Sequence, residues 1–402
     1  MQALKILAIP NLLSPSFELL LKKPLDLLTA KGMIPGYQFR VSGKASRFDI
    51  DAADIVIFQR NCEFRDLASL YYARYKNKFV IYSIDDDLMN TPSDLGGLSL
   101  YYNAQFRRRN IETFYKEADC LKATSDELCR RISTLTFKRV HLVEHLPNDD
   151  QVFSPVLHST DGKIRFITVC NYIHYISALL KDVLPAIVNE FKDQVSFTFY
   201  GVAPRDIFLK SPHIHYVPPL PFDLFMKDLS ARVADAALTP LDINPFTLCK
   251  SNLKFREFAA RGLAGIYSDM PVYSSSVENG RTGFLVPNQP EAWYGAIKNI
   301  IENPKAARGI GLAARKFAEE NYTMEKYAHW LNDNVLRPAH NVQALRNDAN
   351  NVYLRNYYIC LLKQIIFKFY NFHVMVRYFF NVVQKEGLAC AVKKAISYLK
   401  PL

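Results

Sequence analysis

Cysteine is scarce in this sequence, and no two cysteines form a CxxC pair. The seven cysteines are odd in number and scattered, at positions 62, 120, 129, 170, 249, 360 and 390. The sequence therefore indicates neither a disulfide framework nor a zinc site. This usage fits a protein of the reducing cytoplasm.

Long hydrophobic runs are missing too. No uncharged stretch of about 20 strongly apolar residues occurs, so no membrane-spanning helix is predicted. The first apolar run, in MQALKILAIPNLLSP, holds one early lysine and is interrupted at Pro10 and Asn11. It predicts a first β-strand and not a signal peptide. Internal repeats and low-complexity segments do not occur either.

Acidic residues are nearly missing from the end of the chain. Residues 351–402 hold eight Lys or Arg and a single acid, Glu386, so this segment carries +7 of the net charge of +11. The basic character therefore belongs to the tail. Charge confined to one tail, without a recognised RNA or DNA motif, gives no reason to expect nucleic acid as a partner.

The chain of 402 residues is long enough for two domains with large buried cores. Short β-branched or aromatic runs alternate with helical patterns, first in KILAI, QFRV, DIVIFQ, FVIYSI, CLKAT and RVHLVEH, and then in KIRFITVC, VSFTFYG, IHYVP and ADAALTPL. A proline-containing polar linker, Pro147 to Gly162, separates the two series. This rhythm predicts two α/β domains with parallel sheets, residues 1–150 and 160–330, followed by a basic aromatic helical tail, residues 331–402.

The stretch from Asn244 to Arg261, NPFTLCKSNLKFREFAAR, contains the main candidate site. From Lys250 onward it has the residues of a helix, and the 3.6-residue period predicts one mostly cationic face, made of Lys250, Lys254, Glu257 and Arg261. The helix would leave a loop and present free backbone N–H groups, where a phosphate binds well. A solvated surface helix with internal ion pairs explains the same pattern.

A family resemblance rests on the residues after this helix. Gly262 is a natural helix end, AGIYSDM is a short apolar run, and VENGRTGFLVPN comes next. The segment KFREFAARGLAGIYSDMPVYSSSVENGRTGFLVPN resembles the donor-site segment of the group 1, family 4-like glycosyltransferases of polysaccharide or O-antigen biosynthesis. ADCLKATSDELCRRI, in which Ser125 can cap a helix, and HLVEHLPND resemble segments of that family's N-terminal domain. The resemblance implies the GT-B fold, two facing Rossmann-like α/β domains, here with a C-terminal helical extension.

The same resemblance implies the donor site. Glu257 would hold the ribose of a nucleotide-sugar, and Lys250, Ser251 and Lys254 would lie near its diphosphate. Asn244 and Phe246, in the preceding loop, complete the expected set. We expect neither a metal nor a cofactor, because a GT-B site neutralises phosphate with protein groups and the nucleotide-sugar is a substrate.

Two features depart from the family pattern. Eight positions before Glu257 the family has another glutamate, which contacts the donor sugar, whereas this chain has Cys249. The family's Arg and Lys after the first strand of the second domain are also missing, and the segment offers Asn171, His174 and Lys181 instead. Lys250 and Lys254 are the candidates to replace them, and we expect His174 to be a packed or solvated loop residue.

Three adjacent carboxylates, Asp85, Asp86 and Asp87, follow the run FVIYSI and would face the donor helix across a cleft. The position resembles a family subset with the pattern DiDDdl, so Asp85 and Asp86 are candidates for orienting or deprotonating the acceptor hydroxyl. Turn capping and solvation are the simpler explanation of such residues. Asp85-x-Asp87 also matches the metal-binding DxD of the GT-A fold, which stays as an alternative.

The sequence thus predicts a hexosyltransferase-type glycosyltransferase that transfers a sugar from a nucleoside diphosphate to a glycan or lipid-linked acceptor, with retention of configuration. The resemblance implies cell-surface polysaccharide or glycoconjugate assembly, in the cytoplasm at the inner membrane face. Cys249 keeps a second hypothesis open, a catalytically degenerate GT-B subunit that serves as a scaffold for a partner.

The tail carries one apolar stripe at helical spacing: Tyr358, Leu362, Ile365, Phe369, Phe372, Val376, Phe379 and Val383. Such a stripe packs on the protein's own domains, forms a coiled-coil dimer, or lies on a membrane. The charge of +7 and the eleven Tyr or Phe of residues 351–402 suit an anionic membrane surface. Docking on such a surface and self-packing both remain hypotheses at this point.

Overall fold

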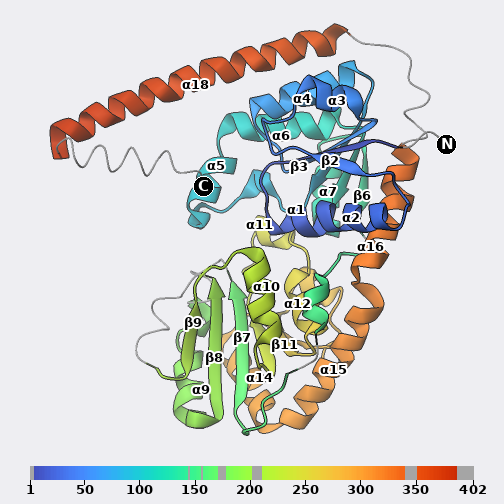
Figure 1. Ribbon diagram of the computed structural model, residues 1–402. Coiled ribbons are helices and arrows are strands. Elements are labelled where there is room, and N and C mark those ends of the chain that lie inside the picture. The colour runs from blue at the N-terminus through green and yellow to red at the C-terminus, as the bar shows by residue number, and fades with distance from the viewer. Residues whose placement is uncertain are drawn as a thin grey trace.

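The computed structural model describes residues 4–143, 145–154, 157–170, 178–201, 211–339 and 351–386, without the side chains of Cys170 and residues 372–386. Two α/β domains lie one above the other, each built on a six-stranded sheet (Figure 1). Every neighbouring pair of strands in both sheets is parallel. This confirms the predicted arrangement of two Rossmann-like domains, and the GT-A alternative does not match it.

The N-terminal sheet has the strand order β2-β1-β3-β4-β5-β6, and the C-terminal sheet has the order β12-β11-β10-β7-β8-β9. The strands of the first sheet are β1 (Ile6–Pro10), β2 (Tyr37–Phe39), β3 (Ile55–Gln59), β4 (Phe79–Ile84), β5 (Cys120–Ala123) and β6 (Arg139–Leu142). Those of the second are β7 (Ile164–Cys170), β8 (Val195–Gly201), β9 (Ile214–Val217), β10 (Ala236–Thr239), β11 (Ala264–Ser268) and β12 (Phe284–Val286).

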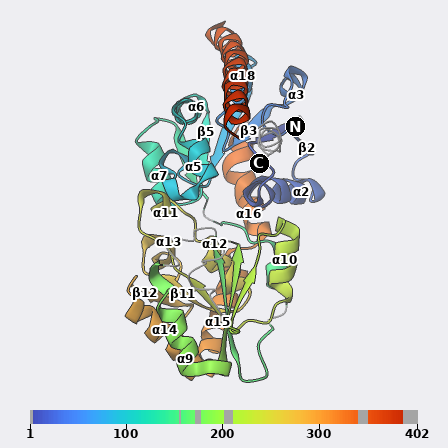
Figure 2. The same cartoon turned by 90° about the vertical axis from the view of Figure 1, so that its left-hand side faces the viewer.

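Helices cover both faces of each sheet (Figures 1 and 2). The helices of the first domain are α1 (Pro15–Phe17), η1 (Glu18–Lys22), α2 (Lys23–Ala30), α3 (Arg47–Ala52), α4 (Phe64–Tyr75), η2 (Leu88–Asn90), η3 (Ser93–Leu95), α5 (Gly97–Tyr102), α6 (Gln105–Glu117) and α7 (Asp126–Ser133). The later helices are η4 (Asp150–Phe153), α9 (Val183–Phe191), η5 (Lys192–Gln194), α10 (Phe222–Ala231), α11 (Pro245–Leu248), α12 (Leu253–Ala260), α13 (Pro271–Ser274), α14 (Pro290–Glu302), α15 (Pro304–Asn321), α16 (Met324–Leu331), η6 (Asn332–Leu336) and α18 (Asn351–Glu386).

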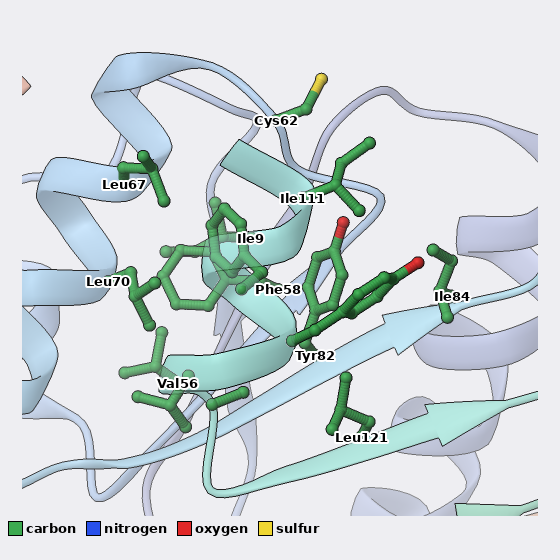
Figure 3. Packing of buried hydrophobic residues seen from close by; sticks show 14 of the residues in the cluster. Ile9, Val56, Phe58, Cys62, Leu67, Leu70, Tyr82, Ile84, Ile111 and Leu121 are labelled. Carbon is green, nitrogen blue, oxygen red and sulfur yellow. The ribbon is translucent and has the colours of Figure 1, made fainter. Parts of the chain in front are cut away.

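The central strands are buried on both faces because alternate side chains enter different cores. In β3, Val56 and Phe58 belong to the core under α4 and α6, whereas Ile57 belongs to the core under α2 and α16. Figure 3 shows the first of these cores, where Phe58 and Tyr82 of the sheet pack below the helices. Both residues are fully buried, which explains why the continuous apolar runs predicted central strands.

The chain returns to the first domain after completing the second. Helix α15 packs against α12 and β11, but α16 packs against α2, and Tyr327 and Leu331 of α16 enter the N-terminal core. Helix α18 then lies along α4, with Tyr357 and Cys360 in the opposite core of the same sheet. Both α16 and α18 are thus anchored on the first domain. The domain boundaries that the sequence suggested, at residues 150, 160 and 330, stay predictions. No helix among the described residues meets the length and hydropathy needed to cross a membrane.

Candidate active site

Polar side chains from three neighbouring strands meet at the carboxyl edge of the N-terminal sheet. Arg60 directly follows β3, the Asp85–Asp87 run follows β4, and Thr124 follows β5. Because these three strands are parallel neighbours, their ends lie at one edge, where open α/β sheets bind ligands. The Thr124 hydroxyl donates to the Asp85 carbonyl over 3.2 Å, which links the residues after β4 to the residue after β5.

Arg60 is the centre of this edge. Its guanidinium donates to both carboxylate oxygens of Asp85, with Nη2 at 2.5 Å from Oδ2, and the same Nη2 donates to Asp86 Oδ2 over 2.8 Å. Arg60 has a φ of +57°, a left-handed conformation that is uncommon for a residue with a side chain. One cation therefore binds two adjacent carboxylates through a backbone conformation that the fold must hold in place.

The electrostatics of Asp85 follow from this arrangement. Burial by itself would raise the pKa of Asp85, but the charge and hydrogen bonds of Arg60 outweigh it and hold the pKa below its usual value. The carboxylates in turn raise the pKa of the Arg60 guanidinium, against the effect of burial. Asp85 is thus kept ionised at neutral pH, and a carboxylate of lowered pKa is a weak proton acceptor.

Asp87 has a different set of partners. Its Oδ2 accepts hydrogen bonds from Arg131 over 2.9 Å and from Asn90 over 2.8 Å, and the Cys249 thiol lies 3.8 Å away. Asp85 and Asp87 are therefore neutralised by separate arginines and do not share one cation. The DxD interpretation needs both carboxylates on the same ion, which this arrangement does not offer.

The donor segment is organised differently from the predicted single helix. The structure has two short helices, α11 and α12, and Lys250 lies in the connection between them. The break follows from local chemistry, because Asn244 caps α11, which ends at Leu248, and α12 begins only after Asn252. The predicted helix is therefore present as α12, but it begins at Leu253, so Lys250 lies before it and not within it.

Arg261 does not belong to the predicted cationic face. Its side chain is buried, at 1% exposure, and donates to the carbonyl oxygens of Ser230 over 2.6 Å and Arg232 over 2.7 Å. Buried carbonyl groups need donors, and a guanidinium satisfies two at once. This residue joins α12 to the end of α10, so its role is structural and its placement by the helical wheel was wrong.

Lys254 and Glu257 do lie together on α12. Lys254 Nζ donates to Glu257 Oε2 over 2.7 Å, and Glu257 is only 4% exposed, not a surface residue as the solvated-face explanation required. The helix ends as predicted at Gly262, whose φ is +67°. The Leu263 and Gly262 N–H groups donate back to the carbonyls of Phe258 and Ala259, as in a Schellman cap.

The other candidates precede this pair in the chain. The Asn244 side chain accepts hydrogen bonds from the N–H groups of Phe246 and Thr247, each over 3.0 Å, so it already serves as a helix cap. Phe246 is buried, with Lys250 Nζ 4.6 Å from its ring centroid. Ser251 is partly exposed in the connection between the two helices. Their roles as donor contacts stay predictions.

The two halves of the site are joined directly across the domains. Lys250 Nζ of the C-terminal domain donates to Asp86 Oδ1 over 3.0 Å, and the Ser125 hydroxyl donates to the Cys249 carbonyl over 2.7 Å. Ser125 also caps α7, as predicted. The structure thus brings Asp85, Asp86 and Lys250 into one network, whereas Lys254 and Glu257 form a separate pair nearby in the chain.

Arg60 was missed in the sequence. The signal was present, since Arg60 follows the run DIVIFQ just as Asp85 follows FVIYSI, and residues at the ends of neighbouring parallel strands lie at one edge. Asn171 and His174, considered as replacements for the family's Arg and Lys, lie outside the described residues.

No protein-family model and no curated protein sequence matches this chain. Solved structures do match it. A glycosyltransferase from Rickettsia africae has a TM-score of 0.58 at 14% identity, with 86% of this chain and 100% of that chain covered. HepE from Anabaena, in complex with UDP-glucose, has a TM-score of 0.58 at 11% identity, covering 83% of this chain and 99% of that one. Sucrose-phosphate synthase from Thermosynechococcus elongatus has a TM-score of 0.58 at 14% identity, with 84% of this chain and 100% of that chain covered.

At this level of identity the similarity concerns the fold. It extends over both domains, and it agrees with the two facing parallel sheets of this chain. The predicted GT-B fold is therefore confirmed both by the topology and by the similarity to these structures.

Proposed function

We propose that this protein is a glycosyltransferase that moves a sugar from a nucleoside-diphosphate sugar to a hydroxyl group. The observation that carries the proposal is the interdomain network in which Lys250, from the predicted donor segment, contacts Asp86 at the carboxyl edge of the facing domain. A donor segment rich in cations therefore faces carboxylates suited to a hydroxyl group. The similarity to HepE, whose structure holds UDP-glucose, supports the same function.

The donor residues have distinct tasks in this proposal. The leaving diphosphate gains negative charge in the transition state, so preorganised cations and helix N–H groups supply the main stabilisation. Lys250 and Lys254 provide the cations, and Ser251 offers a hydroxyl and a backbone N–H before α12. Glu257 binds the ribose hydroxyls, and the capped turn at Asn244 and Phe246 fixes the loop that leads to Lys250.

Asp85 and Asp86 orient the acceptor hydroxyl. We propose retention of configuration, because Arg60 lowers the pKa of Asp85 and so weakens it as a base for back-side attack by the acceptor. In a front-side displacement, the bond from the anomeric carbon to the diphosphate breaks as the bond to the acceptor oxygen forms. The proton of the acceptor hydroxyl then passes to the leaving diphosphate oxygen, so no protein base is needed.

The setting follows the predicted family subset. We propose a glycan or lipid-linked acceptor, in cell-surface polysaccharide or glycoconjugate assembly at the inner face of the membrane, and a hexose as the transferred sugar. We further propose that donor binding needs no metal, since Lys250 and Lys254 supply the positive charge.

A thermal-shift screen of UDP-, GDP-, ADP- and dTDP-sugars tests the proposal. A donor raises the midpoint of unfolding because it binds only the folded protein. The donor that stabilises the protein is then assayed for slow hydrolysis and for transfer to glycan acceptors, with and without EDTA. Stabilisation that requires manganese would contradict the metal-independent site, and no stabilisation by any donor would overturn the function.

A catalytically degenerate scaffold is the second candidate. It is favoured by Cys249, which occupies the position of the family's sugar-contacting glutamate and whose thiol pKa is raised to about 12 by burial and by Asp87. An uncharged thiol accepts hydrogen bonds from sugar hydroxyls poorly. Donor-dependent stabilisation without hydrolysis or transfer across the acceptor panel would support this candidate.

A further inference from the structure

Helix α18 is anchored on one face only. Along that face, Tyr357 and Cys360 enter the N-terminal core, and the Tyr357 hydroxyl accepts a hydrogen bond from Arg47 Nε over 2.8 Å. Further along, Phe367 packs on Phe106, with ring centroids 4.7 Å apart. These contacts hold the helix in a fixed orientation on α4 and α6.

The opposite face of α18 is apolar and exposed. Six of its large side chains are between 51% and 71% exposed: Tyr358, Leu362, Ile365, Ile366, Phe369 and Tyr370. They include the first four members of the stripe predicted from the sequence, so that part of the stripe does not pack on the protein's own domains. Exposed apolar patches of this kind mark interaction surfaces.

A groove of about 600 Å³ continues this surface between α18, α4 and α6. Phe64 and Phe106 line it from the domain, and Ile366 and Tyr370 line it from α18. Phe64 and Phe106 lie at the starts of α4 and α6, and α4 begins five residues after β3 ends at the carboxyl edge of the sheet. The groove thus reaches the end of α4 that is close in the chain to this edge.

Positive charge borders the exposed face on both sides. A helix turns by 100° per residue, so Lys363 and Lys368 are separated by 140° around the helix axis, measured over the side that packs on the domain. They therefore lie at the two margins of the apolar face. Arg355 lies within the apolar face. None of the ion pairs formed by the described residues involves these three side chains. Long basic side chains at the margins of an apolar face suit an interface between hydrocarbon and anionic headgroups.

The charge of the tail favours a lipid surface over a second copy of the chain as the binding partner of this face. In a symmetric dimer through this face, each tail of +7 would meet another of the same charge, because Glu386 is the only acid of residues 351–402. An anionic lipid surface has the complementary charge. We propose that the exposed face of α18 docks in the interfacial layer of an anionic membrane, parallel to its plane.

Docking in this way would hold the first domain, which carries Asp85 and Asp86, at the lipid surface. Figure 1 shows α18 crossing above α6, on the side of the first domain that faces away from the second domain. A lipid-linked acceptor could then reach Asp85 and Asp86 without leaving the membrane. This consequence rests on the proposed function, whereas the docking itself does not.

The test is co-sedimentation of the full chain with vesicles of phosphatidylcholine alone and of phosphatidylcholine with phosphatidylglycerol, at low and high salt. We expect binding to the anionic vesicles that weakens with salt. The double variant Leu362→Gln/Phe369→Gln should lower the bound fraction at least tenfold, and Lys363→Gln/Lys368→Gln should lower it severalfold on anionic vesicles. Leu224→Gln/Leu312→Gln, which replaces two exposed leucines of the second domain, is the matched control and should bind as wild type.

Equal binding by the control and the Leu362/Phe369 variant, or no binding to anionic vesicles, would overturn the proposal. So would a dimer in lipid-free sedimentation equilibrium that the Leu362/Phe369 variant abolishes, since the face would then be a self-association surface. Thermal shift with the best nucleotide-sugar is measured in parallel. If wild type binds vesicles but no donor, the proposed function fails while the docking surface stands.

Discussion

The carboxyl edges of the two sheets share one architecture but hold their charged groups in different ways. At the N-terminal edge three aspartates directly follow β4, and Arg60 of the same edge pairs with two of them, Asp85 and Asp86. At the C-terminal edge the cations Lys250 and Lys254 come from a connection between two short helices and from the first turn of the second. The N-terminal or acidic edge thus takes its charged groups from strand ends, whereas the lysines of the C-terminal or basic edge belong to a loop and the start of a short helix.

This difference explains why Lys250 contacts Asp86. The acidic edge has more carboxylates than arginines, and a lysine from the facing domain completes its charge balance. A diphosphate would compete with Asp86 for the same ammonium group. In the proposed function, this contact is therefore the interaction that donor binding must displace.

Arg60→Ala is the change with the largest expected effect, because it breaks the acidic edge. Removing one partner of a buried ion pair costs about 3 to 5 kcal/mol. We expect the lower end of that range, because Asp85 loses its cation whereas Asp86 keeps its contact with Lys250. Transfer activity should fall at least about a hundredfold, in line with the loss of a positioned catalytic constellation. Urea unfolding and steady-state kinetics measure the two effects.

The pH dependence provides a control for this variant. The folded-state pKa of Asp85 is depressed, so its pairing stabilises the protein above the unfolded-state pKa of about 3.9 and this stability is lost as the pH falls through the folded value. The stability difference between wild type and Arg60→Ala should therefore be largest at neutral pH and shrink below about pH 4. A difference that is independent of pH would contradict the assignment, and Arg60→Lys should recover only part of the loss.

Lys254→Ala and Glu257→Gln test the basic edge. If Lys254 binds the diphosphate, its removal should weaken UDP or GDP binding about tenfold to thirtyfold, the usual range for a charge-assisted hydrogen bond. Glu257→Gln should weaken the binding of nucleoside diphosphates but leave the binding of inorganic pyrophosphate unchanged, because we propose that this carboxylate binds the ribose and pyrophosphate has none. Calorimetric titration measures the affinities. Unchanged affinity in both variants would remove these residues from the donor site.

Asp86→Asn removes the ion pair between the two edges, because an amide carries no charge to pair with Lys250. A neutral amide competes with phosphate for Lys250 less strongly than a carboxylate does, so we expect donor affinity to rise about fivefold, equivalent to about 1 kcal/mol. The gain should vanish in the Lys250→Ala background. Asp87→Asn is the matched control, because Asp87 pairs with Arg131 and not with Lys250. A gain that persists without Lys250 would show that the interdomain pair does not oppose donor binding.

The sequence predicted those features that depend on local patterns. Continuous apolar runs indicated the central strands, Ser125 caps α7 and Gly262 ends α12, because each depends on a few adjacent residues. The carboxylate run at Asp85 was identified because residues at strand ends lie at a predictable edge.

The late start of α12 was missed although it is local, because Asn244 caps a separate short helix, α11. Other features depend on contacts distant in sequence. Arg261 is buried because it binds carbonyl groups at the end of α10, which no helical wheel contains. Lys122, for which no prediction was made, shows the same dependence. It lies in β5 fully buried, and burial lowers its pKa to about 7, with Nζ donating to the Leu20 carbonyl over 3.0 Å and to the Tyr327 hydroxyl. Tyr327 comes from α16, which returns to the first domain 205 residues later, so the sequence around Lys122 contains no sign of it.

Cys249→Ser has the smallest expected effect and decides what the departure from the family pattern means. The Cys249 side chain is fully buried in the N-terminal core and points at Asp87, 3.8 Å away, and a serine hydroxyl keeps both the size and a donor for that carboxylate. We therefore expect donor affinity and turnover to change by less than about twofold, and stability by about 1 kcal/mol at most. Kinetics and chemical unfolding of the variant measure these values. A loss of turnover above about tenfold with unchanged stability would show that the thiol contacts the donor sugar, and the position would then have kept the function of the missing glutamate.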